Sequence, residues 1–153
     1  MRDFSHEMTV FIVEDDASVR DALSLILSLR GYRTACFVNA DDFLAACESD
    51  SVGCVLADIK MPGMSGLELQ ALLPKKGIEL PVIIITGHGD VSAARAAFRL
   101  NAVDFLEKPF DDEQLIAGIE EAFSRERRRL GMRLHDAQRD KLVREARCHV
   151  DKQ

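Results

Sequence analysis

The run Pro81–Ile85, PVIII, constrains the fold most, because it contains five apolar residues and no polar alternation. A strand with one face in water alternates apolar and polar residues, so this unbroken run predicts a strand that is buried on both faces. Such strands lie at the centre of parallel sheets whose faces are covered by helices. We therefore expect an α/β protein built around this segment.

Four further apolar segments are predicted strands, and a helical pattern follows each of the five. The other strands are expected at Thr9–Val13, Arg33–Val38, Val52–Ala57 and Val103–Leu106. The helices are expected to begin at caps or turns at Asp16, Asn39, Ser65, Asp90 and near Asp112, and Pro74 is expected to end the third. Five alternations of this length predict a doubly wound parallel sheet with helices on both faces.

Polar side chains follow the predicted strands at the points where the strands end. Glu14 and Asp15 follow the first strand, Asp58 the third, Thr86 the fourth and Lys108 the fifth. Parallel strands place their carboxyl ends at one edge, so these groups should converge. Three adjacent carboxylates repel each other unless a cation joins them, which predicts Mg²⁺, with Mn²⁺ or Ca²⁺ as possible substitutes. Lys108 would provide a fixed positive charge suited to a phosphoryl oxygen.

This combination of groups suggests chemistry on phosphorus. A carboxylate beside a metal and a cation can attack a phosphoryl group and form an aspartyl phosphate. Taken alone, Asp58 could be a turn or helix-capping aspartate, and Thr86 could be an ordinary threonine at a strand end. The presence of all five groups at strand ends, in order, favours a phosphoacceptor site.

The segments IVEDD, LADIKMPGMSG, IIITGHGD and DFLEKPF resemble the motifs of the receiver domain of two-component response regulators. The sequences TGHGD and EKPF are most similar to those of the FixJ/NarL-like branch, whose members carry a LuxR-type helix-turn-helix output domain. The resemblance covers about residues 8–123. It implies a flavodoxin-like (βα)5 fold with strand order 2-1-3-4-5.

The resemblance also assigns expected roles to the strand-end residues. Asp58 would accept the phosphoryl group, and Asp15, Asp58 and the backbone carbonyl of Lys60 would bind Mg²⁺. Glu14, where many relatives have Asp, would hold a metal-bound water. Lys108 would contact the phosphoryl group, with the Lys108-Pro109 peptide bond cis.

Two residues are implied as a switch that responds to phosphorylation. Thr86 would move to bond a phosphoryl oxygen, and Phe105 would move inward behind it. Phe105 stands where many relatives have Tyr, and it could instead be a plain core residue. His88 is not at metal-ligand spacing, which favours a solvent-facing loop residue.

Charge divides the chain into an acidic body and a basic tail. Residues 1–123 carry a net charge of −11 and residues 124–153 carry +5. The body is therefore a poor nucleic-acid surface. The tail is predicted to be a helical linker that continues the last helix, interrupted at Gly131, or a weak dimer seam. Arg127–Arg129 is more typical of a solvated helix face than of a DNA contact.

Cysteine spacing and the amino end indicate the compartment. Cys36, Cys47, Cys54 and Cys148 show no C-x-x-C spacing, so buried reduced thiols are favoured over metal or redox chemistry. The start of the chain has no apolar signal region, and no segment reaches membrane-spanning length. We expect a cytoplasmic protein without membrane contact.

The expected function is a phosphorylation-activated switch rather than a conventional enzyme. A sensor histidine kinase would phosphorylate Asp58, and the family resemblance implies dimerisation through the fourth helix, fifth strand and fifth helix. DNA would be bound only through an output domain, which the sequence after residue 124 does not contain. The alternatives are a stand-alone receiver acting through protein partners and a Mg²⁺-dependent phosphohydrolase. The second lacks the common D-x-D pattern, because Lys60 occupies the second position.

Overall fold

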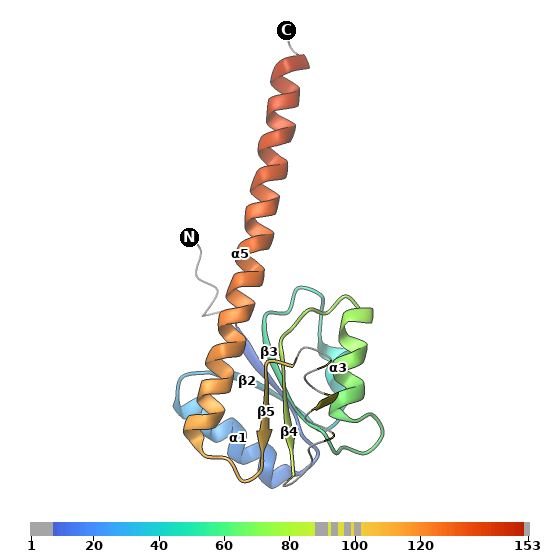
Figure 1. Cartoon of the computed structure of the whole chain (residues 1–153), viewed down its shortest axis with the longest axis vertical. Helices are drawn as coiled ribbons and strands as arrows, with labels where there is room; N and C mark the ends of the chain where they lie inside the picture. The colour runs from blue at the N-terminus through green and yellow to red at the C-terminus, as the bar shows by residue number, and fades with distance from the viewer. Residues whose placement is uncertain (1–7, 88–91, 93–94, 97–98, 100–101, 152–153) are drawn as a thin grey trace.

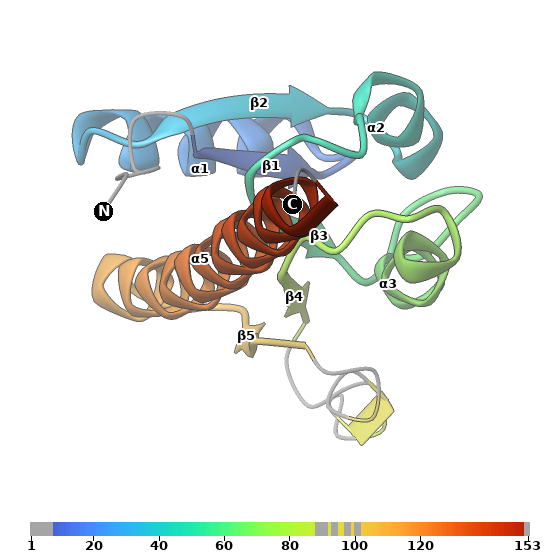
Figure 2. The same cartoon turned by 90° about the horizontal axis from the view of Figure 1, so that it is seen from above.

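The computed structural model contains one parallel five-stranded sheet with helices on both faces (Figures 1 and 2). It describes residues 8–87, 92, 95, 96, 99 and 102–151, with the backbone alone for 132–137, 140 and 144–151. The strands are β1 (Thr9–Val13), β2 (Arg33–Phe37), β3 (Gly53–Asp58), β4 (Val82–Thr86) and β5 (Asp104–Glu107). The helices are α1 (Ala17–Leu29), α2 (Ala40–Ala46), α3 (Gly66–Lys75) and α5 (Asp112–Asp151).

The strand order is β2-β1-β3-β4-β5, and each neighbouring pair is parallel. The predicted fold class and order are therefore confirmed. β3 and β4 each extend one residue further than predicted, because the hydrogen bonds from Ile59 N to Ile85 O and from Lys108 N to Thr86 O, both 2.8 Å, prolong the ladder. Asp58 and Thr86 are thus the last residues of their strands.

Alternating strand residues divide the core into two layers. Val10, Ile12, Leu56 and Ile83 face α1 and α5. Val55, Ala57 and Ile84, with Phe43 of α2 and Leu69 of α3, form the layer on the other face. Figure 2 shows the same division, with α1 and α5 on one side of the sheet and α2 and α3 on the other. Burial on both faces explains why β4 has no polar alternation.

The predicted caps at Asp16 and Asn39 are confirmed, and the third helix begins at Ser65 as predicted, with the Ser65 side chain as its cap. Asp16 Oδ1 accepts a hydrogen bond from Ser18 N at 2.9 Å, Asn39 Oδ1 from Asp42 N at 2.7 Å, and Ser65 Oγ from Glu68 N at 3.1 Å. The predicted cap at Asp90 lies outside the described residues. These caps satisfy backbone N–H groups that have no partner within a helix.

Two predictions about helix ends are wrong. Pro74 does not end α3, which continues to Lys75, because proline in the last turn removes one backbone N–H without stopping the helix. Gly131 does not interrupt α5, which runs as a single helix from Asp112 to Asp151 and extends beyond the sheet (Figure 1). Among the described helices, none is long and apolar enough to cross a membrane.

A buried carboxylate in the first half of the long helix holds it to the sheet. Glu126 is fully buried, and its Oε2 accepts a hydrogen bond from Gly53 N, at the start of β3, at 2.9 Å. Its Oε1 accepts a hydrogen bond from Arg129 Nε at 2.6 Å, and Leu130 packs in the core one residue further. Packing against the sheet therefore continues to Leu130, while the predicted domain boundary at residue 123 stays a prediction.

Candidate functional site

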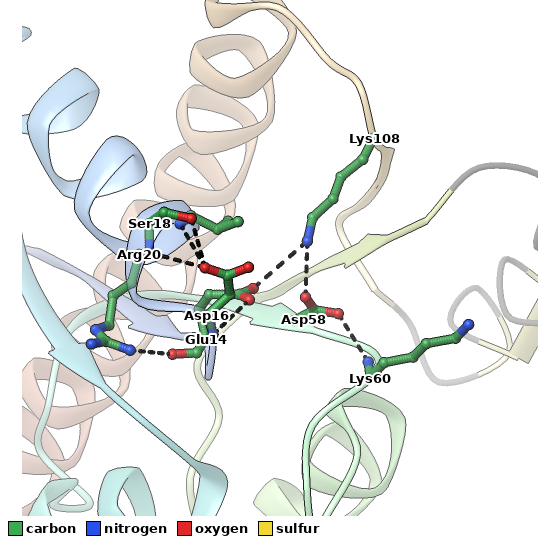
Figure 3. Close-up of polar contacts among 8 residues, drawn as sticks. Glu14, Asp16, Ser18, Arg20, Asp58, Lys60 and Lys108 are labelled. Atoms are coloured by element: carbon green, nitrogen blue, oxygen red, sulfur yellow. Dashed lines mark hydrogen bonds and ion pairs between the residues drawn. The ribbon is translucent and has the colours of Figure 1, made fainter.

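The candidate site lies at the carboxyl edge of the sheet, where β1, β3, β4 and β5 end. Glu14 and Asp15 follow β1 directly, Asp58 ends β3, Thr86 ends β4 and Lys108 follows β5. The five residues predicted from strand ends are therefore all at one edge. Figure 3 shows Lys108 reaching from beyond β5 toward Asp58 and Glu14.

Asp58 is fixed through both carboxylate oxygens. Its Oδ2 accepts a hydrogen bond from Lys108 Nζ at 3.0 Å, and its Oδ1 accepts one from Lys60 N at 2.9 Å. Asp58 is only 7% exposed, so its carboxylate is accessible from a restricted direction. These two contacts hold the carboxylate in one orientation, as an attacking group requires.

The chain after Asp58 turns back closely onto its strand. A Cβ added at Gly66 would lie 2.5 Å from the backbone oxygen of Asp58, so a larger residue cannot occupy this position without a shift. Gly66 thus allows α3 to begin directly against the end of β3. Gly66, the second glycine of the MPGMSG segment, thereby contributes to the shape of the site.

The three acidic residues form a cluster that could hold a metal. Glu14, Asp15 and Asp58 each offer one oxygen, and these oxygens lie within 4.8 Å of one another. Glu14 and Asp58 are buried, while Asp15 is exposed. The Oε2 atom of Glu14 is buried and has no hydrogen-bond partner among the described residues. An all-oxygen set with an unsatisfied buried oxygen fits a hard divalent cation such as Mg²⁺.

Electrostatics of the site distinguish Glu14 from an ordinary surface acid. Burial, together with the hydrogen bond and charge of Asp58, raises the pKa of Glu14 to about 8. Lys108 Nζ lies 4.0 Å from Glu14 Oε2 and partly offsets this effect. Without a metal, Glu14 is therefore largely protonated at neutral pH.

Lys108 remains charged at the same edge. Burial disfavours the charged form of Lys108 and by itself lowers its pKa. The hydrogen bond and charge of Asp58 outweigh burial, so the pKa of Lys108 is raised. The Lys108-Pro109 peptide bond is cis, as the resemblance implied. Lys108 therefore provides a permanent positive charge beside Asp58, suited to the oxygens of a phosphoryl group.

Thr86 and Phe105 lie on adjacent strands. Thr86 is fully buried, and its Oγ1 has no hydrogen-bond partner in the described part of the chain. Phe105 pairs in register with Ile84, two residues before Thr86, and is partly buried against the core layer on that face. The structure brings both residues next to the site, while their movement on phosphorylation stays a prediction. His88 lies outside the described residues.

No sequence pattern indicates two contacts that support the site. Arg20 Nη1 donates a hydrogen bond to the backbone oxygen of Glu14 at 2.9 Å, and Asp16 N donates one to Glu14 Oε1 at 3.2 Å. Arg20 lies in the first turn of α1. Its position one turn after the cap places it near the end of β1, but contact with a backbone oxygen leaves no pattern in a single sequence.

Comparisons with known proteins agree with this geometry. The sequence model of the response regulator receiver domain matches residues 10–120. The chain belongs to the response regulator receiver family. Members of this family are the phosphorylation-controlled switches of two-component signalling systems.

The chain is similar to several curated regulators. It is 44% identical over 113 residues to the transcriptional regulatory protein FixJ of Bradyrhizobium diazoefficiens, covering 74% of this chain and 55% of the relative. It is 40% identical over 116 residues to the response regulator protein TmoT of Ectopseudomonas mendocina, covering 76% of this chain and 53% of the relative. The chain therefore spans about half the length of the curated relatives it matches.

Two solved structures show the same architecture. The structure of FixJ-N superimposes with a TM-score of 0.74 at 41% identity, covering 81% of this chain and 96% of the other. The response regulator StyR superimposes with a TM-score of 0.84 at 36% identity, covering 90% of this chain and 69% of the other. The predicted receiver fold and branch are thus confirmed.

Proposed function

We propose that this receiver accepts a phosphoryl group on Asp58 from the phosphohistidine of a sensor histidine kinase. The observation that carries the proposal is the pair of contacts to Asp58, from Lys108 Nζ at 3.0 Å and from Lys60 N at 2.9 Å, inside the three-acid cluster. A carboxylate oxygen of Asp58 forms the new bond to phosphorus, and the phosphorus–nitrogen bond of the donor breaks. The imidazole leaves and takes up a proton.

The residues around Asp58 have separate roles in the phosphoryl transfer. Lys108 offsets charge on the transferring oxygens, while Lys60 N keeps the carboxylate oriented. Asp15, Asp58 and the backbone carbonyl of Lys60 would hold Mg²⁺, with Glu14 contacting a metal-bound water. The bound cation would neutralise negative charge on the phosphoryl group. Mn²⁺ or Ca²⁺ could substitute as other hard cations.

The switch would use Thr86, the last residue of β4, and Phe105, within β5. The buried hydroxyl of Thr86, which lacks a described partner, is available to bond a phosphoryl oxygen. Phe105 pairs with Ile84, which lies two residues before Thr86 on the same face of the sheet. Phe105 would fill the space that Thr86 leaves when it moves. Phosphorylation would then shift a pre-existing equilibrium between two conformations.

Phosphorylation would change the oligomeric state of the receiver. We expect dimerisation through the face made by the fourth helix, β5 and α5, although most of residues 88–101 lie outside the described part. By analogy with relatives named as transcriptional regulatory proteins, transcription control would follow through a DNA-binding domain. The cytoplasmic location stays a prediction from the sequence.

Incubation with acetyl phosphate and Mg²⁺, followed by intact mass measurement, tests the proposal. We expect one phosphoryl group per chain, and none in Asp58→Asn or after chelation of the metal. Asp50→Asn is the matched control, because Asp50 is exposed in a turn before β3. Labelling that persists in Asp58→Asn would disprove the assignment.

The same reaction separates the switch from a phosphohydrolase. With acetyl phosphate in excess, a switch gives a stable phosphoprotein and slow loss of the label. Rapid, sustained release of inorganic phosphate on several organic phosphates would instead show an enzyme that uses Asp58 as a transient nucleophile. A stand-alone receiver would show the same labelling, followed by binding to a protein partner instead of DNA.

A further inference from the structure

A second polar concavity lies at the opposite edge of the sheet from Asp58. It is a cavity of about 570 Å³ between the end of α1, the start of β2 and α5, and we refer to it as the arginine cavity. Arg30, Arg33 and Arg127 line it, together with Tyr32, Glu120 and Phe123. Because Arg33 begins β2 and Asp58 ends β3, the two sites occupy different edges of the parallel sheet.

The arginines of this cavity are incompletely neutralised. Arg30 Nη2 lies 3.2 Å from Glu113 Oε1, but Glu113 is 81% exposed, so this pair is weak and easily exchanged. In the described part of the chain, neither Arg33 nor Arg127 forms an ion pair. Residues 1–123 carry a net charge of −11, so the presence of Arg30 and Arg33 in one concavity, together with Arg127 from the basic segment, is an exception to the acidic surface.

Among the described residues, Glu120 is the one carboxylate that lines the cavity, and it is already engaged. Tyr32 Oη donates a hydrogen bond to Glu120 Oε1. Burial and this hydrogen bond raise the pKa of Tyr32, so its hydroxyl stays protonated and remains a donor to Glu120. The Tyr32 ring packs edge-on against Phe123 at 5.6 Å between centroids, which gives the cavity an apolar wall beside its cationic groups.

We propose that the arginine cavity binds a small organic phosphate. Guanidinium groups present paired N–H donors that match two phosphate oxygens, and they keep their charge at any physiological pH. A volume of about 570 Å³ lies in the usual range for small-molecule sites and exceeds the needs of a lone inorganic ion. The aromatic wall would contact the organic part of the ligand.

Binding there would connect two parts of the molecule. Arg33 lies at the start of β2, while Arg127 lies on α5 next to the buried Glu126. A ligand held by both arginines would bridge the sheet and the base of the projecting helix seen in Figure 1. The ligand would thereby add to the attachment of α5, independently of phosphorylation at Asp58.

Titration calorimetry and amide NMR with pyrophosphate and ADP, without divalent metal and at constant ionic strength, test this proposal. Asp58→Asn is used as the background, so that the phosphoacceptor site does not contribute. We expect saturable binding with a dissociation constant of about 1 mM or tighter, with shifts near Tyr32 and Phe123. The double variant Arg33→Gln/Arg127→Gln should weaken binding at least tenfold.

Arg128→Gln is the matched control, because Arg128 is 66% exposed, faces Glu121 at 4.0 Å and does not line the cavity. Its affinity should equal that of the background protein. Circular dichroism of all variants checks folding, which exposed arginines are not expected to affect. Unsaturable binding, equal binding in all variants, or shifts confined to the Asp58 edge would overturn the proposal.

A short DNA duplex distinguishes the two possible sources of phosphate. We expect it to leave bound ADP in place, because the concavity admits a small molecule while the acidic body around it, with a net charge of −11 over residues 1–123, repels a duplex backbone. Displacement of ADP by DNA, lost in the Arg33→Gln/Arg127→Gln variant, would show a backbone contact and contradict a small-molecule site.

Discussion

Replacing Glu126 with alanine tests whether the base of α5 is fixed to the sheet. The substitution removes the acceptor of Gly53 N–H and the partner of Arg129 in one step. In the unmodified protein, Gly53 N and Arg129 Nε both donate hydrogen bonds to the fully buried carboxylate of Glu126. The expected result is a loss of folding stability that an exposed charge on the same helix does not show.

The magnitude follows from the groups left without partners. An unsatisfied buried N–H at Gly53 costs about 1–3 kcal/mol, and loss of the charge-assisted hydrogen bond to Arg129 costs about 1.5–3 kcal/mol. The Arg129 side chain is 19% exposed and lies 3.5 Å from Glu79, so it can turn toward solvent and recover part of its cost. We therefore expect a decrease of about 3 kcal/mol in the free energy of unfolding.

Urea unfolding followed by circular dichroism measures this decrease. Glu121→Ala is the matched control, because Glu121 is 52% exposed and forms an i,i+4 pair with Arg125 at 3.3 Å. Its effect should stay within about 0.5 kcal/mol. Hydrogen exchange provides a local measure, since the amide of Gly53 should exchange faster in Glu126→Ala. Equal costs for the two variants, or unchanged exchange at Gly53, would refute the reasoning.

Three further predictions concern a titrating group, a glycine and two thiols. Burial raises the pKa of Glu14 to about 8, so the folded protein retains a proton that the unfolded chain releases near pH 4.5. In metal-free buffer the free energy of unfolding should therefore fall as pH rises from about 5 to 8, and Glu14→Gln should remove most of this slope in urea titrations. Gly53→Ala should cost about 3 kcal/mol or more in the same assay, because φ is +138° and the added Cβ would lie 1.9 Å from Thr9 O. Maleimide labelling with peptide mass mapping should modify Cys36 in the native state and Cys54 only after unfolding, because Cys36 is exposed while Cys54 is buried and burial raises its pKa.

For each of these three predictions, one experimental outcome would contradict it. Stability that rises with pH in metal-free buffer would show that Glu14 is ionised in the folded state. A stable Gly53→Ala protein would mean that β1 and β3 can separate at this point. Rapid native labelling of Cys54 would contradict its burial in the core.

The site could be predicted because its residues follow strands that the sequence marks clearly. Apolar runs ending at Asp58, Thr86 and Lys108 locate the carboxyl edge, and parallel order brings the ends together. The caps at Asp16 and Asn39 and the helix start at Ser65 are predictable for the same reason, since each depends on residues within three positions. Local patterns therefore account for the site and most element boundaries.

Other features depend on partners distant in sequence. Glu126 lies in the tail that the sequence predicts to be a helical linker, and a single sequence does not show that Gly53, 73 positions away, supplies the N–H that Glu126 accepts. Cys36 was expected to be buried, but β2 is an edge strand and its thiol is exposed. The elevated pKa of Glu14 likewise depends on burial and on Asp58, which no local pattern reports.

The central claim is that Asp58 is the phosphoacceptor of this receiver, and locating the phosphoryl group tests it most directly. After reaction with acetyl phosphate and Mg²⁺, borohydride reduction converts an aspartyl phosphate to homoserine, and peptide fragmentation then identifies the modified position. We predict homoserine at residue 58 alone. Homoserine at Asp15 or another acid, or a phosphoryl group that resists borohydride, would contradict the account.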